Sequence, residues 1–258
     1  LWLDLFDALI NVPAQGPQPD LGALAARISP RTKLLILNSP ANPTGGVIPK
    51  ADLETIARLA QKHDFWVMSD EIYSRLVYDN IKAESIYAID GMAERTIVVD
   101  GFSKSYAMTG WRLGYAVMPE KLARKVSLLI THAVGCTAGF TQKAGVAAIE
   151  QGDRYIAEII ERYQRRRNRF IHGLNQIDGL NCRLPEGAFY AFVNTSALGI
   201  PSAKLAERLL QEAGVACVSG TDFGKNGEGF VRFSYATSSG QLQSAVERIA
   251  DFVNKLLR

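Results

Sequence analysis

The sequence has few of the residues that build disulfide or metal-bound scaffolds. Its three cysteines, Cys136, Cys182 and Cys217, are scattered, and no Cys-x-x-Cys pair occurs. An odd, scattered set of thiols is typical of a reducing compartment, so we expect a cytoplasmic protein whose thiols have no functional role. The three histidines lack the spacing of metal ligands, and no metal site is expected.

No charge of one sign dominates, and long hydrophobic runs are missing. The 29 basic residues are set against 26 acidic ones, and nothing in this balance suggests the clustered excess charge of a nucleic-acid-binding protein. No segment is long enough for a transmembrane helix, so no membrane partner is expected. The apolar opening 1–12 contains two aspartates and lacks a basic region, which argues against a signal peptide. With 258 residues, 47% of them hydrophobic, the chain has a globular composition.

Short apolar runs alternate with amphipathic helices in residues 1–150. The runs end at turn residues and are predicted as buried strands over 33–38, 65–68, 96–99 and 113–118. The helix after the first strand has an inner apolar stripe made of Leu53, Ile56, Leu59 and Ala60. This alternation predicts an α/β large domain, a mostly parallel sheet flanked by helices.

The pattern changes in residues 151–258. One long helix is predicted over 153–174, and short strands are predicted near 188–193, 216–218 and 229–234. A helix between Pro201 and Gly214 and a closing helix complete a smaller C-terminal α+β domain. The long helix contains five arginines between Arg162 and Arg169. Because its apolar stripe runs through the same segment, we interpret these arginines as a solvated face rather than a phosphate-binding patch.

Three of the predicted strands end in polar residues. Asn42 lies in a turn rich in Pro, Asn and Gly after the first strand, Asp70 and Tyr73 follow the second, and Lys104 follows the third. Ligands of open α/β sheets bind at the carboxyl ends of strands. We therefore predict that Lys104, Asp70, Tyr73 and the nearby Arg112 line one cleft.

These residue types together suit pyridoxal phosphate. A desolvated lysine such as Lys104 can form a Schiff base with a carbonyl group, and Asp70 can pair with a protonated pyridine nitrogen. Arg112 offers a fork for a phosphate group. Taken singly, each has a plainer interpretation, because Lys104 could be a surface lysine and Asp70 a helix N-cap. The combination favours the cofactor.

Five segments resemble the class I/II, fold-type I aminotransferases that use pyridoxal 5'-phosphate, in the branch of the aspartate and aromatic aminotransferases. They are 39–45 (SPANPTG), 69–73 (SDEIY), 103–115 (SKSYAMTGWRLGY), 185–190 (PEGAFY) and 231–235 (VRFSY). The resemblance covers essentially the whole chain. It implies a pyridoxal-phosphate-dependent transaminase of amino acid metabolism, a homodimer that moves an amino group between an amino acid and a 2-oxo acid.

The resemblance also implies roles for individual residues. Lys104 would be the catalytic Schiff-base lysine, and Asp70 would pair with the pyridine nitrogen. Tyr73 and Asn42 would hold the ring hydroxyl oxygen, and Arg112 would hold the phosphate.

Two further roles concern the phosphate and the substrate. Ser103 would add a phosphate hydrogen bond, although many relatives place that serine three residues before the lysine, where this chain has Gly101. Arg232 would bind the substrate α-carboxylate together with Asn42. A plainer interpretation, a strand arginine that faces water, is weakened by its neighbours Phe233 and Tyr235.

The front of the chain departs from the family pattern. Relatives carry a large N-terminal portion with a phosphate-binding loop and an aromatic ring, and neither precedes Asn42 here. We therefore expect an N-terminally incomplete large domain that binds the cofactor weakly and transaminates slowly or not at all. Two alternatives stay open: C–S lyase or decarboxylase chemistry on the same site, and a non-catalytic aminotransferase-like binding module. We also predict a cis peptide bond at Ser39–Pro40 or Asn42–Pro43.

Overall fold

The structure is a computed structural model that describes residues 20–257. The opening segment 1–12, interpreted above as no signal peptide, lies outside the described residues. Two compact units are present, one made of residues 41–46 and 160–257 and the other of residues 21–40 and 47–159. Neither unit is continuous in sequence, because the turn 41–46 belongs with the C-terminal residues. The functional division predicted at residue 150 stays a prediction.

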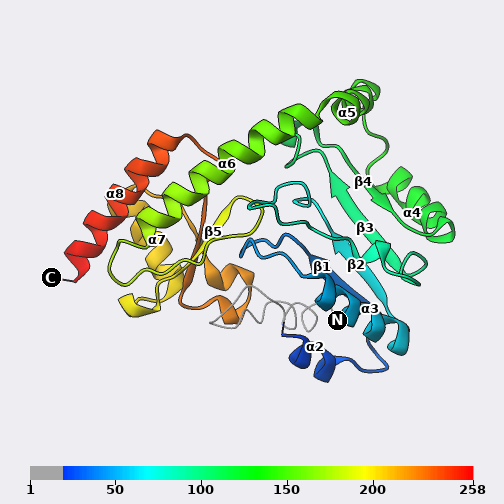
Figure 1. Cartoon of the computed structure of the whole chain (residues 1–258), viewed down its shortest axis with the longest axis horizontal. Coiled ribbons are helices and arrows are strands. Elements are labelled where there is room, and N and C mark those ends of the chain that lie inside the picture. Colours follow the sequence, from blue (N-terminus) through cyan, green and yellow to red (C-terminus); the bar gives the residue numbers. More distant parts are fainter. Residues whose placement is uncertain (1–19, 258) are drawn as a thin grey trace. The chain divides into compact units, whose positions relative to one another are not determined.

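The unit of residues 21–40 and 47–159 contains a four-stranded sheet in the order β1-β2-β3-β4 (Figure 1). Its strands are β1 (Leu34–Asn38), β2 (Trp66–Asp70), β3 (Thr96–Gly101) and β4 (Gly114–Val117). The first three are parallel, and β4 is antiparallel to β3. No crossover helix connects β3 to β4, so the chain returns beside β3 in the opposite direction. The predicted mostly parallel sheet with flanking helices is confirmed.

The helices of this unit are α2 (Leu21–Arg27), α3 (Lys50–His63), α4 (Glu120–Ala133), α5 (Gly139–Gln151) and the start of α6 (Asp153–Leu174). Short 3-10 turns lie at η1 (Ile86–Ala88) and η2 (Thr109–Trp111). In α3 the buried stripe differs by one residue from the prediction, because Ala57 is fully buried and Leu59 is half-buried. The bounds of α6 match the predicted helix.

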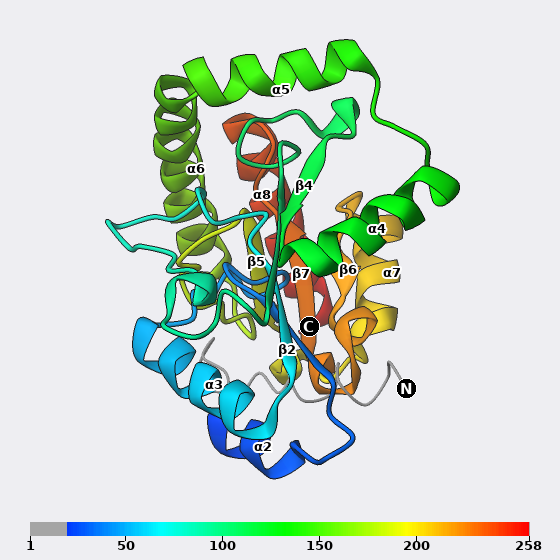
Figure 2. The same ribbon diagram turned by 90° about the vertical axis from the view of Figure 1, so that its right-hand side faces the viewer.

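The unit of residues 41–46 and 160–257 contains a three-stranded antiparallel sheet in the order β5-β7-β6 (Figure 2). Its strands are β5 (Tyr190–Asn194), β6 (Val218–Ser219) and β7 (Phe230–Ser234), joined by 3-10 turns η3 (Ser196–Leu198), η4 (Gly220–Phe223) and η5 (Lys225–Gly227). Helix α7 (Ser202–Ala213) packs against β6, β7 and α8 (Ser239–Leu256). This is the predicted small α+β arrangement.

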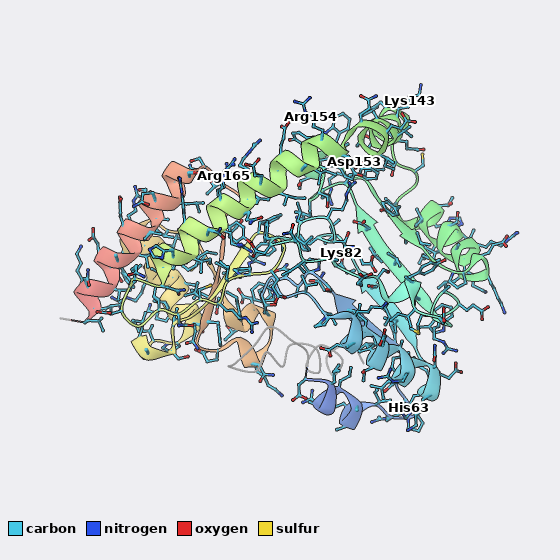
Figure 3. All side chains as sticks on the ribbon, in the orientation of Figure 1. His63, Lys82, Lys143, Asp153, Arg154 and Arg165 are labelled. Carbon is cyan, nitrogen blue, oxygen red and sulfur yellow. The ribbon has the colours of Figure 1, made fainter. Side chains whose placement is uncertain are left out.

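The arginine run on α6 is solvated only in part, which corrects the sequence interpretation. Arg165 of the run extends from the helix, as does Arg154 near the start of α6 (Figure 3). They pair one turn away with Glu161 and Glu158 respectively. Arg167, in contrast, is only 1% exposed. It falls on the helix face of the apolar stripe, so its side chain enters the core.

None of the helices described over residues 20–257 combines the length and the apolar character that crossing a bilayer requires.

Candidate active site

The carboxyl ends of β1, β2 and β3 lie at one edge of the parallel sheet. The register pairs Asn38 with Asp70, and Asp70 with Val99. The Asn38 side-chain amide donates to the Asp70 carbonyl oxygen at 3.1 Å, which fixes the end of β2 beside that of β1. Asp70 is the last residue of β2, and Lys104 follows β3 by three residues. The predicted strand ends are therefore neighbours, while the convergence of their side chains in one cleft stays a prediction.

The Asp70 carboxylate is half-buried and lacks a cationic partner among residues 20–257. One side-chain oxygen accepts from the Ile72 amide at 3.2 Å. Burial raises the pKa of Asp70, and the Ile72 hydrogen bond opposes this rise without cancelling it. Burial also raises the pKa of the neighbouring Glu71 and Asp100 carboxyls. A cation or a hydrogen-bond donor would stabilise the ionised form of Asp70.

Replacing Asp70 with asparagine should raise the free energy of unfolding at pH 7. A carboxyl whose folded pKa lies above its ordinary value of 3.8 costs stability as the pH rises through that range. The gain from Asp70→Asn should therefore disappear below about pH 4, where both states are protonated. Urea denaturation at several pH values measures it. Asp90→Asn, at an exposed site, is the control, and equal stabilisation by both variants at pH 7 would contradict the assignment.

Lys104, Ser103 and Arg112 lie in one loop between β3 and β4. The loop is closed by the Phe102 amide, which donates to the Leu113 carbonyl at 3.1 Å. The Thr109 hydroxyl donates to the Ser103 carbonyl at 2.8 Å, so the start of the loop is also tied to its end. Lys104 and Ser103 are half-buried within it.

Arg112 has left-handed backbone geometry, with a φ of 53°. Its exposed guanidinium donates to the Thr109 carbonyl at 2.9 Å. Among the residues that the structure describes, no carboxylate pairs with Arg112. The guanidinium is therefore able to receive an anion.

Tyr73, three residues beyond β2 in the same unit, is 4% exposed.

Close packing explains why residue 101, three residues before Lys104, is glycine rather than serine. A Cβ atom at this position would lie 3.0 Å from the Gly114 Cα of β4 and 3.0 Å from the carbonyl oxygen of Leu113, the residue before β4. Such contacts require β4 to move away from β3. Ser103 therefore stays the residue of this loop whose hydroxyl is predicted to bind a phosphate group.

Two contacts at this sheet edge were not anticipated from the sequence. The Tyr115 hydroxyl donates to the Asp100 carboxylate at 3.0 Å, and burial is the main reason that the pKa of Tyr115 rises to about 12. Arg75 donates to the Tyr106 hydroxyl at 2.7 Å and pairs with Asp153. The first contact follows from the β3–β4 register, which pairs Asp100 with Tyr115. The second joins segments that no local pattern links.

Arg232 and Asn42 lie together in the other unit. An Arg232 Nη1 hydrogen donates to the Asn42 Oδ1 at 2.6 Å. The guanidinium carbon lies 4.4 Å from the centre of the Tyr190 ring and 4.8 Å from that of Phe223. These rings, rather than the expected Phe233 and Tyr235, surround it.

The reason for this correction is strand alternation. In β7 Arg232 points to the opposite face from its neighbour Phe233, which is 4% exposed. Tyr235, directly after β7, is 0% exposed. Tyr190 reaches Arg232 diagonally from β5, since the register pairs Arg232 with Phe192. No carboxylate within residues 20–257 is paired with Arg232, so its remaining donors can bind one.

The turn that carries Asn42 is tightly fixed within its unit. The amides of Glu186 and Gly187 donate to the Gly45 carbonyl at 2.9 and 2.8 Å. Gly45 has a φ of 70°, and a Cβ atom there would lie 2.5 Å from the Pro185 Cβ, so only glycine fits. The bonds before Pro40 and Pro43 are both cis, which confirms that prediction.

Comparison with known proteins places the chain in a family. The family model described as aminotransferase class I and II matches residues 8–249. The chain belongs to the class I and II aminotransferases. It is 44% identical to the aspartate aminotransferase of Pyrococcus abyssi and 43% identical to the aromatic-amino-acid aminotransferase 2 of Thermococcus litoralis, each over 86% of this chain. The resemblance stated from the sequence is confirmed.

This class I and II aminotransferase chain also shares its fold with solved members. The aromatic aminotransferase from Pyrococcus horikoshii OT3 superposes with a TM-score of 0.89 at 41% identity, over 92% of this chain and 64% of that one. The chain spans 57% of the length of each of the two sequence relatives.

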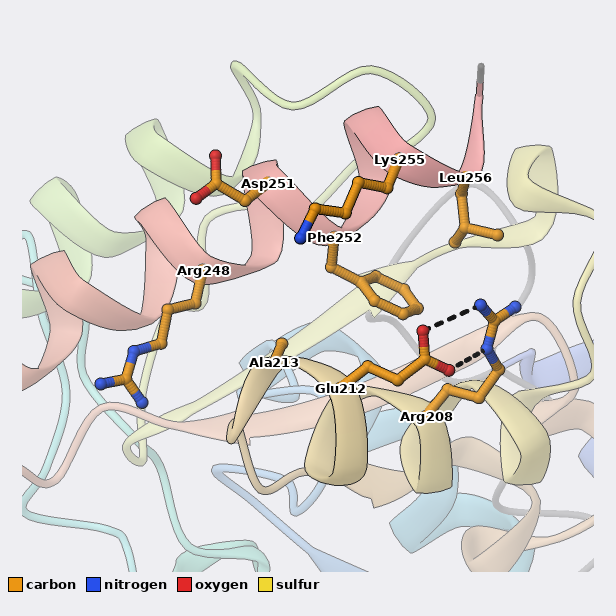
Figure 4. A pocket seen from close by; sticks show the side chains of 8 residues that line it. All are labelled: Arg208, Glu212, Ala213, Arg248, Asp251, Phe252, Lys255 and Leu256. Carbon is orange, nitrogen blue, oxygen red and sulfur yellow. Dashed lines mark hydrogen bonds and ion pairs between the residues drawn. The ribbon is translucent and has the colours of Figure 1, made fainter.

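A surface cavity of about 370 Å³ lies on α7 and α8 of the aminotransferase chain, apart from every predicted site residue (Figure 4). In this cavity Arg208 forms a bidentate ion pair with Glu212: its Nε and Nη2 donate to the two carboxylate oxygens at 2.6 and 3.1 Å. The Arg208 guanidinium also lies 5.2 Å from the centre of the Phe252 ring. This arginine therefore already has a carboxylate partner, in contrast to Arg232.

Proposed function

We propose that the protein to which this chain belongs is a pyridoxal-phosphate-dependent enzyme that transfers an amino group between an amino acid and a 2-oxo acid. The proposal rests on family membership and on one geometric observation. Arg232 is held between two aromatic rings and an amide oxygen, with no carboxylate partner in the described part of the chain. Such a pre-oriented fork suits the α-carboxylate that all amino acids and 2-oxo acids share.

Residues in the unit of residues 21–40 and 47–159 fit pyridoxal 5'-phosphate. The half-buried Asp70 carboxylate, whose pKa is raised by burial, suits a protonated pyridine nitrogen. Arg112, with no carboxylate partner in residues 20–257, suits the phosphate, and Ser103 lies in the same loop. When bound, the cofactor supplies an electron sink for the carbanion that forms at the substrate α-carbon.

Each residue of the proposed site has a distinct task. Lys104 Nζ would attach the cofactor and would take the proton from the substrate α-carbon. Asp70 would keep the pyridine nitrogen protonated, and Tyr73 and Asn42 would hold the ring hydroxyl oxygen. Arg232, with Asn42 on one of its nitrogens, would bind and orient the substrate α-carboxylate.

The names of the relatives support aspartate or an aromatic amino acid as the amino donor. They favour transamination over lyase, decarboxylase or purely binding functions. We further propose a cytoplasmic homodimer. Large apolar side chains exposed on α4 and α5 support an associating surface, among them Leu129 at 66% and Phe140 at 72% exposure.

A labelled amino donor tests the proposed reaction. The full chain, incubated with pyridoxal phosphate, ¹⁵N-aspartate and 2-oxoglutarate, should form ¹⁵N-glutamate, which mass spectrometry detects even at slow turnover. Borohydride reduction of the complex should place the covalently attached cofactor on the Lys104 peptide. Label released as ammonia would instead indicate elimination chemistry. Label that stays in aspartate would contradict the proposal.

A further inference from the structure

Arg167 is a buried cation with a specific set of acceptors. Its Nη1 donates to the Pro185 carbonyl at 2.8 Å, and its Nε and Nη2 donate to the Asn168 side-chain oxygen at 2.9 and 2.8 Å. The residue is 1% exposed. Burying a guanidinium is unfavourable unless its donors are satisfied, so the Pro185 carbonyl is held at a defined distance from α6.

The segment that begins at Pro185 supports the turn 41–46. The next two amides, of Glu186 and Gly187, both donate to the Gly45 carbonyl. The absent Gly45 side chain leaves room for the Pro185 ring and the Gly187 carbonyl, which would lie 2.5 and 2.8 Å from a Cβ atom. With this little clearance, a displacement of Pro185 must move the turn as well.

The same turn carries Asn42, which accepts the 2.6 Å hydrogen bond from Arg232. Contacts are thus continuous from Arg167 through Pro185 and Gly45 to Asn42 and Arg232, all within one compact unit. We propose that Arg167 is a positioning residue for carboxylate binding, which sets the place of Asn42 and, through it, the orientation of the Arg232 guanidinium. This inference rests on the proposed function of Arg232.

The experiment measures binding of maleate, an unreactive dicarboxylate, to the full chain by isothermal titration calorimetry. Arg167→Met removes the donor to the Pro185 carbonyl while keeping an unbranched apolar stem. We expect about tenfold weaker maleate binding. Arg169→Met removes an exposed arginine from the same helix and should leave the affinity unchanged. Thermal melting of each variant checks that it is folded.

A double-mutant cycle separates positioning from general loss of stability. If Arg167 acts through Asn42, then adding Arg167→Met to Asn42→Ala should weaken maleate binding no further than Asn42→Ala does alone. Multiplying effects would overturn the proposal, because they would place Arg167 on an independent route. Unchanged maleate affinity in Arg167→Met would overturn it as well.

Arg167→Lys is the second variant, in case the methionine variant does not fold. It keeps the charge but lacks the planar fork, so it should also bind maleate more weakly than the wild type. Loss of cooperative melting in both variants would assign Arg167 to stability alone and overturn the proposal. A wild-type chain that does not bind maleate would contradict the proposed function itself, whereas unchanged binding by folded Arg167 variants would contradict the positioning role alone.

Discussion

Replacing Lys104 with alanine should abolish covalent capture of pyridoxal phosphate and lower the rate of amino transfer by about a thousandfold or more. In the role that we propose, Lys104 is both the nucleophile that attaches the cofactor and the base that moves the α-proton, and the variant lacks both. A positioned general base alone contributes roughly 10²–10⁴-fold. Mass spectrometry after borohydride reduction measures capture, and the labelled-aspartate assay measures transfer.

Lys82→Ala is the matched control for this prediction. Lys82 is an exposed lysine of the same unit (Figure 3), and its removal should change neither capture nor transfer. The role given to Lys104 would be wrong if Lys104→Ala still carried the cofactor on a single other lysine. It would also be wrong if both alanine variants lost capture equally.

Replacing Arg232 with glutamine should weaken maleate binding by at least about 150-fold. A carboxylate bound by the guanidinium fork receives two charge-assisted hydrogen bonds, each worth roughly 1.5–3 kcal/mol, so the loss is about 3 kcal/mol or more. The Tyr190 and Phe223 rings hold the fork in place and reduce the entropy lost on binding. Calorimetric titration of each variant measures the change.

Arg208→Gln is the control, because Arg208 also lies over an aromatic ring but already pairs with Glu212. Its loss should leave maleate affinity within about twofold of the wild type. Arg232→Lys keeps the charge without the fork and should fall between the two. If Arg232→Gln and Arg208→Gln bound maleate equally well, Arg232 would not be the carboxylate site.

Much of the fold follows from local patterns along the chain. The apolar period of α6 predicts its bounds, and Pro201 and Gly214 enclose α7 because proline begins helices readily and glycine ends them. The positions of Asp70 at the end of β2 and of Lys104 shortly after β3 follow from the parallel sheet, because parallel strands bring their carboxyl ends to one edge.

Contacts between distant segments could not be predicted in the same way. The apolar pattern of α6 does not predict that the Arg167 side chain is buried. Its burial depends on a hydrogen bond to the Pro185 carbonyl, which lies far from local patterns in the helix. To predict the rings around Arg232, one must know the β5–β7 register and the position of η4, which contains Phe223. Strand alternation alone would have removed Phe233 and Tyr235 from consideration.

The turn 41–46 has a consequence for the order in which the chain acquires its parts during synthesis. Asn42 and Arg232 are separated by 190 residues, yet they form one hydrogen bond. The ribosome must therefore add 190 further residues after Asn42 before this contact can form. Contacts of such long sequence separation form slowly and late. A ribosome that stops before residue 232 would release a polypeptide that keeps Lys104 and its loop but lacks the arginine that we propose for carboxylate binding.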